Sequence, residues 1–324
     1  MSERLATKTC CVSHIEDVDG LSSAALVKAA TGADVMLTDY AGLMHSLASV
    51  PRDSGRVVIC DLGADSVESD AFVDRLVNLR RTAEVTYIDH HFLSRAAKGG
   101  LVKAGIELVH DVGECASILT YQKFKTSLPE KARMVALLGA VTDGMDDRPR
   151  AAKMMEQGDR QFVLLEATLL SHALSFVGGR EKFRQFVVRE LAKMKQPHEM
   201  KGVTDYALRQ LAVERRLSEE VRRLGHRMGK IAYVETNQYS SLMVANLLIG
   251  AFGVLVGVAI KVGRNGWCEV ILSGTSECKI HLGRTIGRIA AELGGSGGGH
   301  QLASGCRIPL GKERQMLAEL AARV

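Results

Sequence analysis

Aspartate and histidine side chains recur in four short segments of the first 150 residues, in patterns that suit metal-assisted phosphoryl chemistry. In chain order the segments are HIEDVDG (14–20), ICDLGAD (59–65), YIDHH (87–91) and ALLGAVTDGM (136–145). Oxygen-rich ligand sets with a few imidazoles suit Mn²⁺ or Mg²⁺ better than soft metals. Two such ions can share one carboxylate and promote in-line attack of water on phosphorus. These residue types therefore predict a two-metal site.

Each segment by itself also has a purely structural explanation. Asp17 and Asp19 precede a predicted helix and could cap it, and Asp61 could cap the helix that follows it. YIDHH is the most specific segment, because one of two adjacent imidazoles can bind metal while the other contacts an oxyanion. Asp143 ends an apolar run, where its charge needs a partner. Only the ordered series of all four favours the metal site.

Apolar runs that read as strands directly precede the first three segments. The predicted strands are 9–13, 35–37, 56–60 and 84–88, and the predicted helices are 21–30, 67–80, 115–124 and 131–141. Strands that alternate with helices predict a mostly parallel sheet. Because ligands of such sheets bind beyond the carboxyl ends of the strands, we expect the acidic and histidine segments to converge at one edge.

The rest of the chain predicts two further parts. Residues 151–227 are charged and helix-like, whereas glycine-broken apolar runs at 255–262 and 267–273 read as strands, followed by a helix at 283–293 and the segment GGSGGGHQLASG (294–305). The predicted fold class is α/β. Its parts are a catalytic domain with a mostly parallel sheet flanked by helices (1–180), a helical linker (181–230) and a smaller α/β substrate-binding domain (231–324).

Composition is consistent with a cytoplasmic enzyme that acts on an anion. The 324 residues carry a formal net charge of +5, and the seven cysteines form no CxxC pair, which favours free thiols in a reducing compartment. The N-terminus lacks the apolar segment of a signal peptide. Residues 242–260 are almost entirely apolar, but three glycines divide them. We therefore expect a buried helix and strand there and no membrane association.

The order and spacing of these motifs resemble the DHH phosphoesterase superfamily, and residues 294–305 resemble the glycine-rich loop of its DHH-associated domain. The particular GGSGGGH form is most similar to archaeal RecJ-like proteins. The resemblance implies two Mn²⁺ ions as cofactor, with Mg²⁺ or Co²⁺ as alternatives. It implies the following metal ligands, with Asp61 bridging both ions: His14, Asp17, Asp19, Asp61, His90 and Asp143.

The resemblance also implies roles for residues outside the metal cage. His91 would contact the scissile phosphate, and Asp89 would support it, so that the catalytic set is His91, Asp89 and Asp61. A second phosphate or the nucleotide would be held by Gly297, Gly298, Gly299 and His300. Two departures stand out. His14 lies three residues before Asp17, where family members use two or four, and SGT (273–275) replaces a common arginine, so that Arg284 or Arg288 would supply that charge.

Three functions remain open on the sequence. The first is hydrolysis of short oligonucleotides or single-stranded nucleic acid from an end, which releases nucleoside 5′-monophosphates. The second is action on pAp or on cyclic or linear dinucleotides, since the same residues would serve and only the pocket depth would differ. The third is an inactive scaffold in a replication complex, which the retention of all four motifs disfavours. Expected partners are RNA, DNA or nucleotide substrates, with a homodimer and replication or repair proteins as alternatives.

Overall fold

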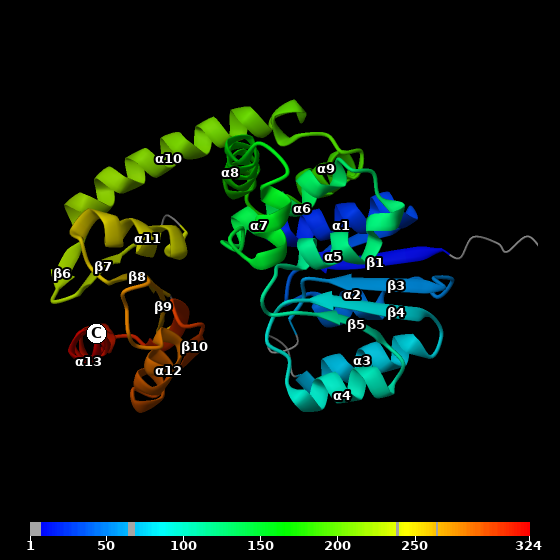
Figure 1. Ribbon diagram of the computed structural model, residues 1–324. Helices are drawn as coiled ribbons and strands as arrows, with labels where there is room; N and C mark the ends of the chain where they lie inside the picture. The colour runs from blue at the N-terminus through cyan, green and yellow to red at the C-terminus, as the bar shows by residue number, and fades with distance from the viewer. Residues whose placement is uncertain (1–7, 64–68, 238–239, 264) are drawn as a thin grey trace, which may run out of the picture. The chain divides into compact units, whose positions relative to one another are not determined.

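The computed structural model describes residues 8–63, 69–237, 240–263 and 265–324 (Figure 1). The chain divides into two units, residues 1–211 and 212–324. The first unit holds a sheet of five strands, and the second holds a sheet of six. The α/β fold class expected from the sequence is confirmed, and in chain order a helical middle section follows the strands of the first sheet and precedes those of the second.

The first sheet has the order β2-β1-β3-β4-β5, and all of its neighbouring strands are parallel. Its strands are β1 (Thr9–His14), β2 (Asp34–Thr38), β3 (Arg56–Cys60), β4 (Glu84–Asp89) and β5 (Glu107–His110). The interior strands are almost wholly buried, as expected for a parallel sheet with helices on both faces. The carboxyl ends of β1, β3 and β4 therefore lie side by side.

Helices cover both faces of this sheet, because successive strand residues point to opposite sides. One face packs against α1 (Val18–Thr31), α5 (Ala116–Phe124) and α6 (Ala132–Thr142) (Figure 1). The other face packs against α2 (Leu43–Ala48), α3 (Ser69–Arg80) and α4 (Arg95–Lys103). The unit continues through α7 (Pro149–Met155), α8 (Arg160–Val177) and α9 (Glu181–Ala192), and α10 (Val203–Leu224) begins in it.

The second unit has a mixed sheet of order β10-β11-β9-β8-β7-β6, in which only β7 and β8 pair in parallel. Its strands are β6 (His226–Met228), β7 (Ile231–Glu235), β8 (Val256–Val262), β9 (Trp267–Gly274), β10 (Ser296–Gly299) and β11 (Ala303–Pro309). The remaining helices are α11 (Ser241–Phe252), α12 (Leu282–Glu292) and α13 (Glu313–Arg323). Helix α11 packs with the end of α10, whereas α12 and α13 pack together in a separate core.

The apolar stretch 242–260 forms the expected helix and strand, α11 and β8. The strand is largely buried, whereas α11 buries only one face and Leu242 is 47% exposed. Among the described residues, none of the helices combines the length and apolar character needed to cross a bilayer. All seven cysteines are buried and free, as expected from their spacing.

The glycine-rich segment differs from the expected loop. Residues 296–299 form the edge strand β10, which pairs with β11. Two glycines of α12 allow that helix to approach the strand closely. A Cβ atom on Gly283 would lie 2.0 Å from the carbonyl oxygen of Gly299, and one on Gly287 would lie 2.9 Å from that of Gly297. The segment is a strand because it pairs with β11, and the glycine-rich pattern alone does not reveal that pairing.

Candidate metal centre

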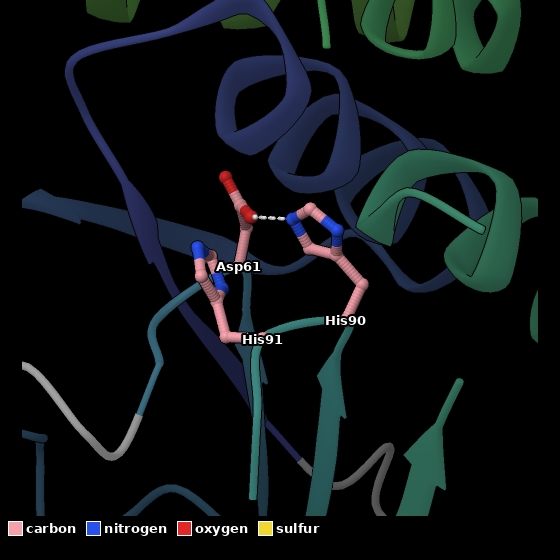
Figure 2. Close-up of side chains that lie close together, drawn as sticks. All are labelled: Asp61, His90 and His91. Carbon is pink, nitrogen blue, oxygen red and sulfur yellow. Dashed lines mark ion pairs between the residues drawn. The ribbon is translucent and has the colours of Figure 1, made fainter. Parts of the chain in front are cut away.

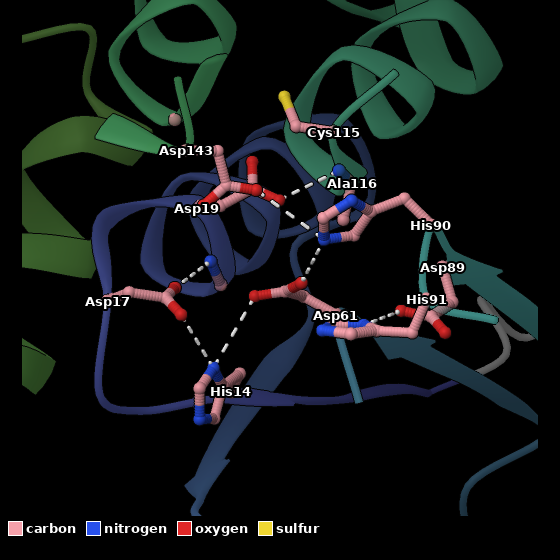
Figure 3. Close-up of polar contacts among 12 residues, drawn as sticks. His14, Asp17, Asp19, Asp61, Asp89, His90, His91, Cys115, Ala116 and Asp143 are labelled. Atoms are coloured by element: carbon pink, nitrogen blue, oxygen red, sulfur yellow. Dashed lines mark hydrogen bonds and ion pairs between the residues drawn. The ribbon is translucent and has the colours of Figure 1, made fainter. Parts of the chain in front are cut away.

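The carboxyl edge of the first sheet gathers the acidic and histidine side chains (Figure 3). His14 ends β1, Asp61 directly follows β3, and Asp89 ends β4. Asp17 caps the amino end of α1, with its Oδ1 accepting a hydrogen bond from the backbone N–H of Gly20 at 2.9 Å. The remaining members of the cluster are Asp19 in the first turn of α1, His90 and His91 after β4, and Asp143 at the end of α6.

These side chains form three overlapping groups, in each of which the potential ligand atoms lie within 4.8 Å of one another. The groups are His14, Asp17 and Asp61; Asp19, His90 and Asp143; and Asp61, His90 and His91. Asp61 and His90 each belong to two groups, and Figure 2 shows the Asp61 carboxylate between the two adjacent imidazoles. Nε2 of His90 lies 3.3 Å from Oδ1 of Asp61 and 3.5 Å from Oδ2 of Asp143.

His14 joins this cluster in spite of its unusual spacing. Its Nδ1 lies 2.8 Å from Oδ2 of Asp17 and 3.5 Å from Oδ2 of Asp61. Its Nε2 lies 3.6 Å from a carboxylate oxygen of Glu16. Burial by itself would lower the pKa of His14, but the hydrogen bond with Asp17 and the negative charges of Asp17 and Asp61 outweigh it and raise the pKa to about 10.

The backbone of Asp61 is held in a conformation that non-glycine residues seldom adopt. Its φ angle is 57°, in the left-handed region. The backbone N–H of Asp61 donates a hydrogen bond of 3.0 Å to the carbonyl of Ile88, which ties the residue to the neighbouring strand. Strained backbone of this kind concentrates at functional sites, where the surrounding structure fixes the direction of a side chain. Here it directs the carboxylate into the cluster.

The centre holds more negative charge than its own residues neutralise. Burial, followed by the charges of Asp17 and Asp19, raises the pKa of Asp61 well above its usual range. Burial and the charges of Asp19 and Asp61 raise the pKa of Asp143 to about 9. A carboxylate pKa rises in this way when a buried negative charge lacks a counterion. Divalent cations would supply that charge.

Two orphaned polar atoms also fit a metal ion. Nε2 of His14 and Oδ2 of Asp61 are buried, and neither has a hydrogen-bond partner among the described residues. Buried imidazole nitrogens and carboxylate oxygens without partners are costly. Because the atoms belong to an oxygen-rich set with imidazoles, the site could hold Mn²⁺ or Mg²⁺.

Asp19 is fixed by a helix from a distant part of the chain. Its carboxylate accepts hydrogen bonds from the backbone N–H groups of Ala116 (2.8 Å) and Ser117 (2.9 Å) at the start of α5. A helix amino terminus stabilises a carboxylate through its free N–H groups and its dipole. Gly139 of α6 packs so closely that a Cβ atom there would lie 2.4 Å from Oδ1 of Asp19.

His91 is oriented by a chain of hydrogen bonds. Nδ1 of His91 lies 2.9 Å from Oδ1 of the buried Asp89, whose Oδ2 accepts a 2.9 Å hydrogen bond from the hydroxyl of Tyr87. Burial opposes protonation of His91, but Asp89 outweighs it and raises the pKa of the imidazole. The hydroxyl of Tyr40 lies 3.4 Å from Nε2 of His91, and the Tyr40 ring also packs against that of His14.

Sequence reasoning missed two residues of this site. Tyr40 follows β2, so its place just after a predicted strand was the one available signal. No sequence pattern marks Arg184 of α9 as a residue of the site. Nη1 of Arg184 donates hydrogen bonds to the carbonyls of Ile15 (2.7 Å) and Glu16 (3.1 Å), and its Nη2 donates to that of Gly178 (2.9 Å). Arg184 thereby holds the turn that carries Asp17.

Replacing Arg184 with methionine is expected to reduce metal-dependent activity about tenfold, in the range found for residues that support metal ligands. The aliphatic part of the side chain is retained, but the hydrogen bonds to the turn at Ile15 and Glu16 are lost. Titration with Mn²⁺ should show that more metal is required for half-maximal rate. Arg189 of the same helix is exposed, and Arg189→Met should leave the Mn²⁺ requirement unchanged. An unchanged requirement in Arg184→Met would contradict the role of Arg184.

The remaining predicted residues belong to the second unit. Gly297, Gly298 and Gly299 lie in β10, and His300 follows it. The backbone N–H of Gly283, at the start of α12, donates a hydrogen bond to the carbonyl of His300 at 3.0 Å. Two exposed arginines, Arg284 and Arg288, lie one turn apart on α12. The structure thus brings the glycine strand, His300 and the start of α12 together within this unit.

Comparisons with known proteins agree with this architecture. Residues 229–324 match the DHHA1 domain, and no curated protein matches the sequence. The pGpG-specific phosphodiesterase PggH of Vibrio cholerae has a similar structure, with a TM-score of 0.62, 14% identity and coverage of 97% of this chain and 98% of that one. A manganese-bound exonuclease RecJ gives a TM-score of 0.61, with 18% identity and coverage of 99% and 91%.

RecJ of Thermus thermophilus in complex with Mn²⁺ is also similar, with a TM-score of 0.64 and 16% identity. The match covers 98% of this chain but 52% of that RecJ. The chain therefore shares its fold with these phosphodiesterase and exonuclease structures, and its residues 229–324 match the DHHA1 domain. It combines a fold like that of phosphodiesterases and exonucleases with a candidate His/Asp metal site.

Proposed function

We propose that this protein is a two-metal phosphodiesterase that releases nucleoside 5′-monophosphates from an end of short oligonucleotides or single-stranded nucleic acid. The observation that carries the proposal is the set of three overlapping ligand groups, of which two share Asp61 and two share His90. The raised pKa values of Asp61 and Asp143 support it, since both report negative charge without a counterion. The DHH phosphoesterase fold supports the reaction type.

The proposed metal ligands divide into two sets that share Asp61. One ion would be held by His14, Asp17 and Asp61. The other would be held by Asp19, Asp61, His90 and Asp143. When bound, such ions polarise a phosphoryl oxygen and lower the pKa of a water molecule.

The chain's own residues would orient the substrate. Nδ1–H of His91 donates a hydrogen bond to Asp89, so Nε2, which lies 3.4 Å from the Tyr40 hydroxyl, is the ring nitrogen that would contact a phosphate oxygen. The raised pKa of His91 favours the protonated imidazole, whose positive charge would stabilise the charge that develops on the phosphate. In the second unit, the N–H groups of Gly297 to Gly299, with His300, Arg284 and Arg288, would hold another phosphate or the base.

A linear dinucleotide is the second candidate substrate. The observation that favours it is the structural likeness to a pGpG-specific phosphodiesterase over 97% of this chain and 98% of that one. An enzyme for dinucleotides should cleave more slowly as the substrate lengthens.

Labelled RNA and DNA of two to about twenty nucleotides, assayed with Mn²⁺, would test both candidates. We expect nucleoside 5′-monophosphates as products, with the highest rates on the shortest substrates. Cleavage of dinucleotides alone would select the second candidate, and pAp assayed in parallel would reveal a phosphatase. Absence of hydrolysis on every substrate would refute the proposed function.

Metal removal provides an independent check. Chelation should abolish hydrolysis, and Mn²⁺ should restore it. Because ligands that bind only the folded state stabilise it, Mn²⁺ at 100 times its dissociation constant should add about 2.7 kcal/mol to the free energy of unfolding. Thermal melts with and without Mn²⁺ measure this effect. Activity that persists in excess chelator would rule out the metal-dependent mechanism.

A further inference from the structure

A groove at the opposite edge of the first sheet has a lining that favours an anion. It lies where the amino end of β3 meets the carboxyl ends of α2 and α3, and its volume is about 490 Å³. The candidate metal centre lies at the carboxyl ends of β3 and β4, so the groove is a separate site. Its volume is within the range of about 300–1,000 Å³ typical of small-molecule pockets.

Two arginines line this groove, and no acidic residue does. Neither Arg52 nor Arg75 forms a hydrogen bond or an ion pair within the part of the chain that the structure describes. Nε of Arg75 is buried without an acceptor, and so is the hydroxyl of Ser54, a residue that is 3% exposed. A buried guanidinium N–H without an acceptor is unfavourable. An anion in the groove would pair with the two guanidinium groups, which have no acidic partner in its lining.

A neighbouring groove provides a comparison, because its cationic side chains are paired with other groups of the protein. That groove, of about 370 Å³, is lined by Arg56, Arg80 and Lys123 together with two glutamates. Arg56 pairs with Glu84 at 3.4 Å, Lys123 pairs with Glu107, and Nε of Arg80 donates to the carbonyl of Gly105 at 2.9 Å. Each cation there already has a partner on the protein. Arg52 and Arg75 differ because they have none among the described residues.

The rest of the lining suits a ligand with a flat apolar part. Leu47, Val50 and Leu79 supply an apolar wall, and Asn78 and Thr82 supply polar groups near it. A lone phosphate would use only the arginines. A phosphate ester that carries a ring of moderate polarity would use both parts of the groove.

We propose that this groove binds an organic monophosphate of nucleotide size, with its phosphate on Arg75 and Arg52 and its base against the apolar wall. Guanidinium groups bind phosphate with two parallel hydrogen bonds, which gives both strength and direction. Nucleoside monophosphates are the products of the proposed reaction, and the choice of nucleotide as ligand rests on that function. Binding in the groove itself does not require catalysis.

Isothermal titration calorimetry of the full chain with AMP and GMP tests this site. A chelator in the buffer keeps divalent ions away from the candidate metal centre and prevents hydrolysis. Inorganic phosphate and adenosine are titrated separately to measure the contribution of each half of the ligand. AMP or GMP should bind more tightly than inorganic phosphate and more tightly than adenosine. Arg75→Met should weaken that binding at least tenfold, and Arg52→Met should weaken it as well.

Arg81→Met is the matched control, because Arg81 is exposed, lies just beyond α3 and does not line the groove. It should bind nucleotide like the wild type. In thermal melts, the bound nucleotide should raise the Tm of the wild type and of Arg81→Met but not that of Arg75→Met, and circular dichroism of each variant checks the fold. Nucleotide binding that survives both Arg75→Met and Arg52→Met, or no binding at millimolar concentration, would overturn the proposal. Hydrolysis assays are separate, so either proposal can fail alone.

Discussion

Asp61→Asn is expected to lower the rate of phosphodiester hydrolysis on the order of 10³-fold, the largest effect of any single substitution in the centre. Asp61 belongs to both proposed ligand sets, because its carboxylate lies near His14 and Asp17 on one side and near His90 on the other. Its loss would therefore affect both proposed ions at once. Its side chain is 2% exposed, and water cannot readily replace a carboxylate in such a position. Steady-state rates on a short oligonucleotide with Mn²⁺ would measure the loss.

Asparagine is the right replacement because it changes the charge and little else. It has the shape of aspartate, and it tolerates the left-handed region in which Asp61 lies at φ 57°. The fold should therefore survive the substitution.

Asp61→Asn should stabilise the metal-free protein, although it lowers the rate of hydrolysis. Burial and the charges of Asp17 and Asp19 raise the pKa of Asp61, which means that its negative charge destabilises the metal-free protein. Removing the charge should raise the Tm without metal and reduce the further rise that Mn²⁺ produces. Asp74→Asn is the control, because Asp74 is exposed on α3 and should change neither quantity. Full activity in Asp61→Asn would disprove the two-metal mechanism.

Gly139→Ala is expected to reduce both activity and stability, although it adds a single methyl group. The new Cβ would lie 2.3 Å from Oγ of Ser117, 2.4 Å from Oδ1 of Asp19 and 3.0 Å from Cα of Asp19. Contacts this short force a shift of α6 or of the Asp19 carboxylate. Overpacking of a buried site costs about 1–3 kcal/mol. Because Asp19 is a proposed ligand, hydrolysis should fall about tenfold or more.

A second helical glycine makes this test specific. Gly99 lies within α4, and a Cβ atom there would meet no other atom within 4 Å. Gly99→Ala should therefore stabilise the protein by up to about 1 kcal/mol through helix propensity alone. Urea denaturation and Mn²⁺-dependent rates would be measured for both variants. Equal behaviour of the two would mean that α6 does not position Asp19.

The sequence by itself determined the class of fold and the edge of the sheet where the acidic residues meet. Apolar runs of strand length ended at His14, Asp61 and Asp89, and parallel strands place such ends together. The helices α5 and α6 were also predicted within a few residues. These features are local, so the order of residue types along the chain is enough to predict them.

The tertiary structure decided what holds the site together. Arg184 donates a hydrogen bond to the carbonyl of Ile15, which lies 169 residues earlier in the chain. Ala116 of α5 donates one to Asp19, which lies 97 residues earlier. Gly139 is required by packing against Asp19, which lies far from it in the sequence. Each of these contacts joins segments that are distant in the chain. The spacing of residues along the chain cannot predict such contacts, because they form only when the helices pack on the sheets.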